Sequence, residues 1–252
     1  MKPRWDRWPT AAAVIALAAA VVLVVIGVAV AATRTTDEYA STYTPSPDAT
    51  AAPIPTVDLA RVKSVLFIGD SWTYGTNAQP VTRGFAYRAA ELLGVNYEVY
   101  GFGSVGYINT GADRAGAFAE RWAKVAPKTV PDLIVLEGSQ NDLDFRGNIS
   151  DAANSFISTL KGQFPQSQIV MMGPAPASEG LISALAPIDS TLYDVAYAQR
   201  VPYISPLTLS WFDASNLAQF IDPGNGSPYP NTEGHNFIAE HLVAELRALS
   251  TS

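Results

Sequence analysis

From residue 61 onward, short apolar runs alternate with longer segments whose apolar residues recur at helical spacing. The short runs predict buried strands, because a parallel sheet is covered on both faces. We expect these strands at 65–68, 97–100, 133–136, 169–172 and 201–204. The periodic segments predict helices at 84–93, 113–124, 151–161, 181–199 (interrupted near Pro187) and 232–249. The alternation of strands and helices predicts a three-layer α/β/α, flavodoxin-like domain with about five parallel strands.

An uninterrupted apolar run, from Ala11 to Ala32, precedes this domain. About 20 helical residues cross a bilayer core of about 30 Å, so the run predicts one transmembrane helix. Basic residues lie before it, and the positive-inside rule places residues 1–10 in the cytoplasm and the rest outside the cell membrane. A cleaved signal peptide, giving a secreted protein, is the alternative, because Ala29-Val30-Ala31 resembles a cleavage site.

Residues 33–60 are rich in threonine, serine, proline and alanine and lack apolar periodicity. Proline removes backbone donors and favours extended conformations, so we expect a linker that holds the domain away from the membrane. Such a tract is also open to O-glycosylation. The folded domain is expected over residues 61–252.

The composition excludes several kinds of chemistry. The chain has no cysteine, which excludes disulfides, thiolate nucleophiles and cysteine-ligated metals. His235 and His241 are six residues apart and do not share a helix face, so they do not form a metal-binding pair. The net charge of −7 does not suggest nucleic-acid binding. We therefore expect no cofactor, no metal and no nucleic-acid partner, and we expect a monomer.

Polar or glycine-rich segments follow the first three predicted strands: Asp70-Ser71, Gly101–Gly106 and Glu137–Asp142. Ligands of open α/β sheets bind at the carboxyl ends of strands, so we expect these segments to converge. Ser71 is then the candidate nucleophile of an ester-cleaving site. Gly106, whose backbone N–H a substrate can approach closely, and Asn141, through its amide, are candidate donors to the oxyanion.

Three motifs, in this order, resemble those of the GDSL, or SGNH, hydrolases. They are Gly69-Asp70-Ser71-Trp72-Thr73-Tyr74-Gly75, Gly103-Ser104-Val105-Gly106 and Ser139-Gln140-Asn141-Asp142, where Ser139 replaces the usual glycine. The resemblance covers roughly residues 62–249. It implies the SGNH form of this fold, a serine esterase or lipase activity, and an oxyanion hole shared by Ser71 N–H, Gly106 N–H and Asn141.

The fourth motif of that family differs in this chain. The family places its catalytic base in Asp-x-x-His, usually followed by Pro and, a few residues on, Gly-His. Aligning Pro230 and Gly234-His235 puts Tyr229 where the catalytic histidine stands and Gly226 where its aspartate stands. Tyrosine is a poor base at neutral pH, so the base must be sought elsewhere.

His235 is the nearest histidine and the remaining candidate for the base. Its spacing relative to Ile238, Leu242 and Leu246 places it on the apolar stripe of the last helix, where a packed core histidine is the alternative interpretation. Asp222 would orient His235 only if its loop folds back, and the other interpretation of Asp222 is a turn residue.

We therefore expect a membrane-anchored, extracytoplasmic serine ester hydrolase that forms an acyl-enzyme on Ser71. Its substrate would be a small ester, a lipid or an acylated glycan. The enzyme would be an esterase that cleaves acyl or O-acetyl esters, or a lipase. The alternative is a degraded member of the fold that binds a cell-envelope glycan or lipid without cleaving it.

Two other motifs were weighed against this interpretation. Gly101–Gly106 matches the dinucleotide fingerprint Gly-x-Gly-x-x-Gly, but no helix is predicted to begin at its third glycine. The Gly-x-Ser-x-Gly elbow of α/β-hydrolases is absent, because Thr73 stands two residues after Ser71.

Overall fold

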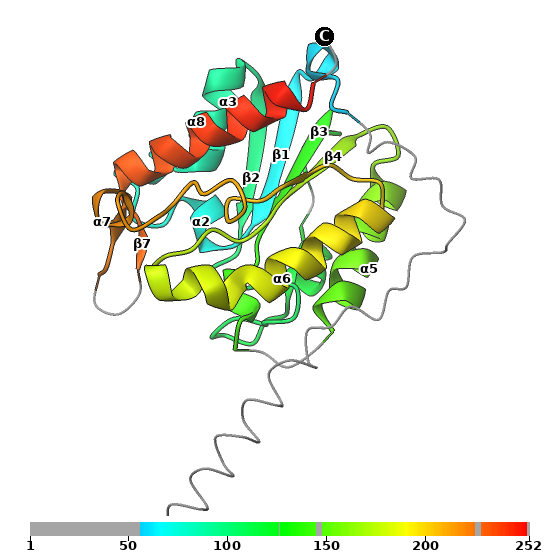
Figure 1. The fold of residues 1–252 in the computed structure, drawn as a ribbon. Helices are drawn as coiled ribbons and strands as arrows, with labels where there is room; N and C mark the ends of the chain where they lie inside the picture. Colours follow the sequence, from blue (N-terminus) through cyan, green and yellow to red (C-terminus); the bar gives the residue numbers. More distant parts are fainter. Residues whose placement is uncertain (1–55, 126, 145–147, 225–227, 251–252) are drawn as a thin grey trace, which may run out of the picture. The chain divides into compact units, whose positions relative to one another are not determined.

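The computed structural model describes residues 56–125, 127–144, 148–224 and 228–250. These residues form a parallel sheet covered by helices on both faces (Figure 1). The predicted transmembrane helix at 11–32 and the predicted linker as far as residue 55 lie outside the described residues. Within the described ranges, no helix has the length and apolar character needed to span a membrane.

The central sheet has five parallel strands in the order β2-β1-β3-β4-β5, which confirms the predicted α/β sheet. Their bounds are β1 Ser64–Gly69, β2 Asn96–Gly101, β3 Leu133–Glu137, β4 Gln168–Met172 and β5 Tyr203–Ile204. The strand order reverses direction at β1, which lies between β2 and β3. Such a switch point opens a crevice at the carboxyl ends of the strands, where ligands of this architecture bind.

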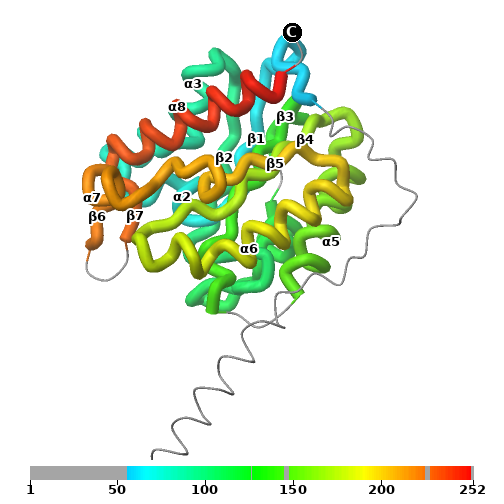
Figure 2. Tube along the Cα trace, in the orientation of Figure 1, coloured from blue at the N-terminus to red at the C-terminus, as the bar shows by residue number. Residues whose placement is uncertain are grey.

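Helices cover both faces of the sheet (Figures 1 and 2). One face carries α3 (Phe85–Leu93) and α8 (Thr232–Ala248), and the other carries α5 (Ile149–Gln163) and α6 (Glu179–Ala198). Shorter helices are α2 Ser71–Tyr74, α4 Phe118–Trp122 and α7 Leu217–Phe220, with 3-10 turns at Leu59–Arg61, Val81–Arg83 and Gln140–Asp142.

The largest buried hydrophobic cluster of the described residues joins the sheet to the helices on one of its faces. It connects Phe67 of β1 to Phe85 of α3 and Leu242 of α8. Val57 also belongs to it, and the N–H of Val57 donates to the carbonyl of Leu249 at 2.9 Å, which ties the two ends of the described chain together. The described residues between 56 and 250 therefore share one large hydrophobic core, as a self-folding domain requires.

Two predicted helices differ from the structure. The helix expected at 113–124 is confined to Phe118–Trp122, because Arg114 (φ +53°) and Gly116 (φ +119°) adopt backbone angles that no α-helix contains. By contrast, α6 continues through Pro187 without interruption. Burial of its apolar face outweighs the backbone hydrogen bond that proline cannot make.

A short antiparallel pair was not predicted from the sequence. It joins β6 (Ile221–Asp222) to β7 (Tyr229–Pro230), with Asp222 opposite Tyr229. Strands of two residues are too short to produce a periodic signal. The pair matters because it fixes the backbone at Tyr229, directly before α8.

Candidate active site

Ser71 lies just beyond the carboxyl end of β1, where the chain turns sharply at Asp70, and it is the first residue of α2. The carboxylate of Asp70 caps this helix by accepting a hydrogen bond from the N–H of Trp72 at 2.7 Å. Gly75, in the left-handed conformation (φ +91°), ends it. The Ser71 side chain is held on a rigid support and donates to no described acceptor, so its hydroxyl is available to a ligand.

A pocket of about 230 Å³ opens above Ser71. Its walls come from the segments after β1, β2 and β3 and from the start of β7. They are formed by Asp70, Ser71, Trp72, Ser104, Gln140, Asn141, Pro228 and Tyr229. The predicted convergence of three polar segments at one edge of the sheet is thus confirmed.

Asn141 joins these segments to one another. Its side-chain Nδ2 donates to Oδ2 of Asp70 at 2.8 Å and to the carbonyl of Val105 at 3.0 Å. The amide therefore spans the ends of all three strands and lines the pocket beside Ser71. Both of its hydrogens are used within the protein, so donation to a substrate oxygen requires one of these two bonds to be exchanged.

The backbone N–H of Gly106 does not face the Ser71 pocket, although it was predicted to be an oxyanion donor. It donates to the carbonyl of Asn109 at 3.0 Å, and Gly106 does not line the Ser71 pocket. A Cβ at this position would lie 2.3 Å from Oδ1 of Asp142. The buried Asp142 carboxylate accepts the N–H groups of Tyr107, Ile108 and Asn109, at 2.8, 3.1 and 2.8 Å. A glycine is needed here for the approach of that carboxylate, and the structure does not bring its N–H to Ser71.

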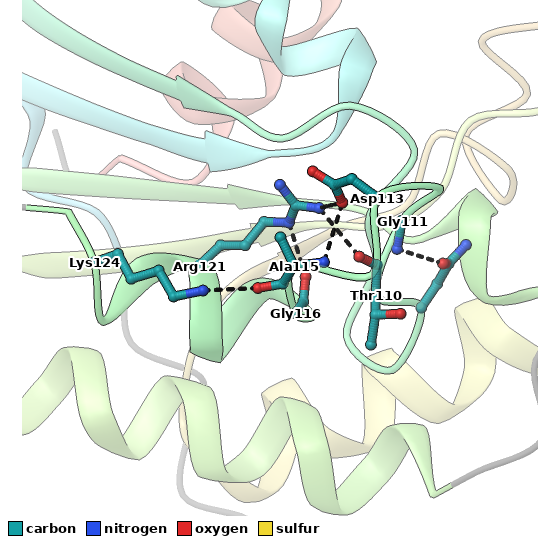
Figure 3. A network of polar contacts seen from close by, with 8 residues as sticks. Thr110, Gly111, Asp113, Ala115, Gly116, Arg121 and Lys124 are labelled. Carbon is teal, nitrogen blue, oxygen red and sulfur yellow. Dashed lines mark hydrogen bonds and ion pairs between the residues drawn. The ribbon is translucent and has the colours of Figure 1, made fainter.

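The segment that follows, residues 110–116, is held by Arg121 on α4 and by Lys124, two residues after that helix (Figure 3). The guanidinium of Arg121 pairs with Asp113 and donates to the carbonyls of Thr110 and Gly116, at 3.1 and 2.8 Å. Lys124 adds a hydrogen bond to the carbonyl of Ala115 at 2.8 Å. These contacts stabilise an irregular segment that follows the glycine-rich loop and that does not itself line the Ser71 pocket.

His235 does not reach the pocket, and the expectation that it acts as the base is corrected. Its Nδ1 accepts the N–H of Phe85 at 3.2 Å, and its Nε2 donates to the carbonyl of Thr76 at 2.9 Å. The ring stacks on Phe85 and is 0% exposed. Burial lowers its pKa from 6.5 to about 4. Both ring nitrogens are occupied by backbone groups, so His235 is a core residue that joins α8 to α3.

Tyr229 takes the place in the pocket that the fourth motif assigns to a catalytic histidine. Its hydroxyl makes no hydrogen bond to a described residue. Asp222 does not orient a base, because it is exposed and its Oδ1 accepts the N–H of Gly224 at 2.9 Å, as a turn residue does. Gly226 lies outside the described residues.

Two buried carboxylates, those of Asp70 and Glu137, lie next to the segment that carries Ser71, a feature that was not predicted from the sequence. Oε2 of Glu137 accepts the Asp70 N–H at 3.2 Å and the Thr73 hydroxyl at 2.8 Å. Burial, and then the nearby Glu137 charge, raise the pKa of Asp70 well above its usual range. Burial also raises the pKa of Glu137. The signal available in the sequence was an acidic residue at the end of the apolar strand Leu133–Glu137.

Gln140 was likewise not singled out from the sequence. It lines the pocket, and its Oε1 is buried without a hydrogen-bond donor. Within the described ranges, no cluster of three or more histidine, aspartate or glutamate side chains is arranged to hold a metal ion. The groups available to a ligand are therefore neutral and polar, apart from Asp70.

Both a protein-family model and several solved structures resemble this chain. The model of the GDSL-like Lipase/Acylhydrolase family matches residues 67–237. No curated protein sequence matches the chain significantly.

Several solved structures share the fold at low identity. A family two carbohydrate esterase from Clostridium thermocellum, in complex with cellohexaose, is 19% identical with a TM-score of 0.56, over 79% of this chain and 66% of that one. A family two carbohydrate esterase from Cellvibrio japonicus is 20% identical with a TM-score of 0.57, over 79% and 63%. A structure described as a GDSL-like lipase from Bacteroides ovatus is 17% identical with a TM-score of 0.52, over 74% and 99%. At these identities the likeness establishes a shared fold.

Proposed function

Because the chain belongs to the GDSL-like lipase/acylhydrolase family, we propose that it is a serine ester hydrolase whose nucleophile is Ser71. The observation that carries this proposal is the position of Ser71. It stands at the carboxyl end of β1, the strand at the switch point of the sheet, with a hydroxyl that no described residue engages, in a pocket that it shares with Asn141. An esterase needs a nucleophile that a substrate can reach, on a rigid support, with hydrogen-bond donors beside it.

The proposed reaction has two steps. Ser71 Oγ attacks the ester carbonyl, and its proton passes through water to the leaving oxygen, which departs as the alcohol and leaves an acyl-enzyme. Water then attacks the acyl-enzyme, which releases the acid and returns a proton to Ser71 Oγ. The developing oxyanion is stabilised by the Ser71 N–H and by Asn141 Nδ2. For this, the amide exchanges one of its hydrogen bonds, to Asp70 or Val105, for the substrate oxygen. Catalytic hydrogen bonds often reach their final lengths only when substrate is bound.

The size and the lining of the pocket support one class of substrate. A volume of about 230 Å³ and walls that include Ser104 and Gln140 suit a short acyl group on a polar alcohol better than a long fatty chain. The carbohydrate esterases that share this fold support an acylated glycan as substrate. We propose further that the domain works outside the cytoplasm on a membrane anchor, as the apolar run at 11–32 suggests.

A second candidate function is supported by the missing base. Tyr229 occupies the position of the catalytic histidine, and no histidine lines the described walls of the pocket. The same pocket then binds an envelope glycan or lipid without cleaving it. The neutral polar groups of Gln140 and Tyr229 serve such binding as well as they serve catalysis.

Hydrolysis of p-nitrophenyl acetate by purified residues 56–252 separates the two functions. The esterase proposal expects turnover that Ser71→Ala abolishes, while the circular dichroism spectrum stays unchanged. Equal background rates for the wild type and Ser71→Ala, across acetyl, butyryl and octanoyl esters, would favour the binding function.

A further inference from the structure

A second cavity, larger than the Ser71 pocket, lies at the β5 edge of the sheet. Its volume is about 600 Å³, against about 230 Å³ above Ser71, and the two share no residue. It is enclosed by α6, by the segment that follows β5 and by the last turn of α8, and Figure 2 shows this segment running between the two helices. Cavities of about 300–1,000 Å³ are typical of small-molecule sites.

The walls of this cavity are mainly apolar. Ile182 on α6, Leu207 and Leu209 after β5, and Leu249 beyond α8 contribute to them. Leu209 is 45% exposed and Tyr193, on α6, is 47% exposed. Large apolar side chains that line a hollow and remain in contact with water favour a ligand with an apolar body.

The charged side chains in the lining are both acidic. Asp189 is buried on α6, and its carboxylate accepts the Tyr203 hydroxyl at 2.6 Å and the Ser205 hydroxyl at 2.7 Å. Glu245 on α8 is half-buried, and its carboxylate has no hydrogen bond or ion pair with a described residue. Among the described residues that line the cavity there is no lysine, arginine or histidine. The charges that the described lining can carry are therefore negative, which favours a cation over an anion.

Two tyrosine rings complete this environment. Tyr193 and Tyr203 stand edge to face, with centroids 5.9 Å apart and planes at 82°. Aromatic faces attract ammonium groups through their quadrupole, and more strongly where water is partly excluded. Burial raises the pKa of Asp189, and a cation bound beside it would lower that pKa.

We propose that this cavity binds a soluble organic cation, an ammonium group carried on an apolar or aromatic body, between Glu245 and the tyrosine rings. The apolar walls receive the body of the ligand, and Glu245, together with the more deeply placed Asp189, balances its charge. This site is independent of the reaction at Ser71, and neither function requires the other.

The test uses purified residues 56–252 and three probes of similar size. Benzyltrimethylammonium carries the cation, benzyl alcohol is neutral and benzoate is an anion. We expect one saturable site for benzyltrimethylammonium by isothermal titration calorimetry, with benzyl alcohol about tenfold weaker or more and benzoate without measurable binding. Equal binding of all three probes, or no saturable binding of the cation, would overturn the proposal.

Glu245→Gln keeps the shape of the side chain and removes its charge. We expect it to weaken benzyltrimethylammonium binding about five- to tenfold. Glu240→Gln is the matched control, since Glu240 is exposed on the same helix and does not line the cavity, and it should leave binding unchanged. Equal binding by both variants would contradict the role of Glu245.

Tyr193→Leu keeps an apolar wall and removes one ring. It should weaken the binding of benzyltrimethylammonium and leave the binding of benzyl alcohol unchanged. An equal loss of binding for both probes would contradict a cation–π contribution.

Vesicles of phosphatidylcholine supply the alternative source of an ammonium group. Capture of these vesicles that Glu245→Gln abolishes would overturn the assignment to a soluble molecule and place the cation on a lipid.

Discussion

The backbone N–H of Phe85 donates to Nδ1 of His235 at 3.2 Å, deep between α3 and α8. Because Nε2 of the same ring bonds to the carbonyl of Thr76, His235 has no lone pair or proton to offer a substrate. In the described structure both ring nitrogens of His235 therefore serve packing between α8, α3 and the segment at Thr76. Four predictions follow from His235 and from the groups around Ser71.

Replacing His235 with alanine should destabilise the fold. The change removes a stacked ring and two hydrogen bonds and leaves two buried backbone groups without partners, a loss of about 2–4 kcal/mol in the free energy of unfolding. Urea unfolding followed by circular dichroism measures this. Any esterase activity, measured on the folded fraction, should persist. Full stability together with lost activity would restore His235 as a base.

The pH dependence of the free energy of unfolding should also show that His235 is buried as a neutral ring. Its pKa is lowered to about 4 in the folded protein, so the unfolded chain, with a pKa near 6.5, takes up the proton first on acidification. The contribution of the neutral ring is therefore present above about pH 6.5 and is lost as the pH falls towards about 4. The stability gap between wild type and His235→Gln should narrow by about 1.4 kcal/mol for each pH unit in this window.

The comparison with His235→Gln is needed because buried acids act in the opposite direction. The pKa values of Asp70 and Glu137 are raised, so the folded protein keeps their protons to a higher pH than the unfolded chain. Their burial costs stability at neutral pH, and this cost declines on acidification. Both proteins share that contribution, which cancels in the difference. A gap that stays constant from pH 7 to pH 4 would contradict the buried neutral histidine.

Tyr229→His should increase hydrolysis of p-nitrophenyl acetate. It places an imidazole in the pocket with Ser71, at the position where the family motif has its base. A positioned general base contributes about 10²–10⁴-fold, and we expect the lower part of that range, because Gly226 cannot orient the ring as an aspartate would. The gain should appear as the pH rises through about 6.5. Tyr229→Phe, the control, should show no gain, and an unchanged rate in Tyr229→His would contradict the proposed place of Tyr229.

Gly106→Ala should destabilise the protein strongly, whereas Gly103→Ala should not. An added Cβ at Gly106 meets the buried carboxylate of Asp142 at 2.3 Å, while at Gly103 it meets nothing within 4 Å. We expect a loss of about 2–4 kcal/mol for the first and less than about 0.5 kcal/mol for the second. Thermal unfolding of the two variants tests this, and equal melting temperatures would show that Gly106 has no packing role.

The sequence determined the architecture of this domain. Buried parallel strands are continuous apolar runs, and the helices that cover them carry apolar residues at a period near 3.6. The five strands and the long helices could therefore be predicted from the sequence pattern. The segments with Ser71 and Asn141 could be placed at one edge for the same reason, because parallel strands carry their carboxyl ends to one side of the sheet.

The tertiary structure alone decided which groups remain free. Whether His235 acts as a base depends on Phe85 and Thr76, which are far from it in the chain, and no local pattern encodes those hydrogen bonds. The acidic pair Asp70 and Glu137 comes together only when β1 and β3 pair side by side. Local periodicity shows which face of a helix or strand a residue occupies. The pocket, and the shifted pKa values of buried groups such as Asp70 and Glu137, arise from contacts between distant segments. Those contacts exist only after the sheet has assembled.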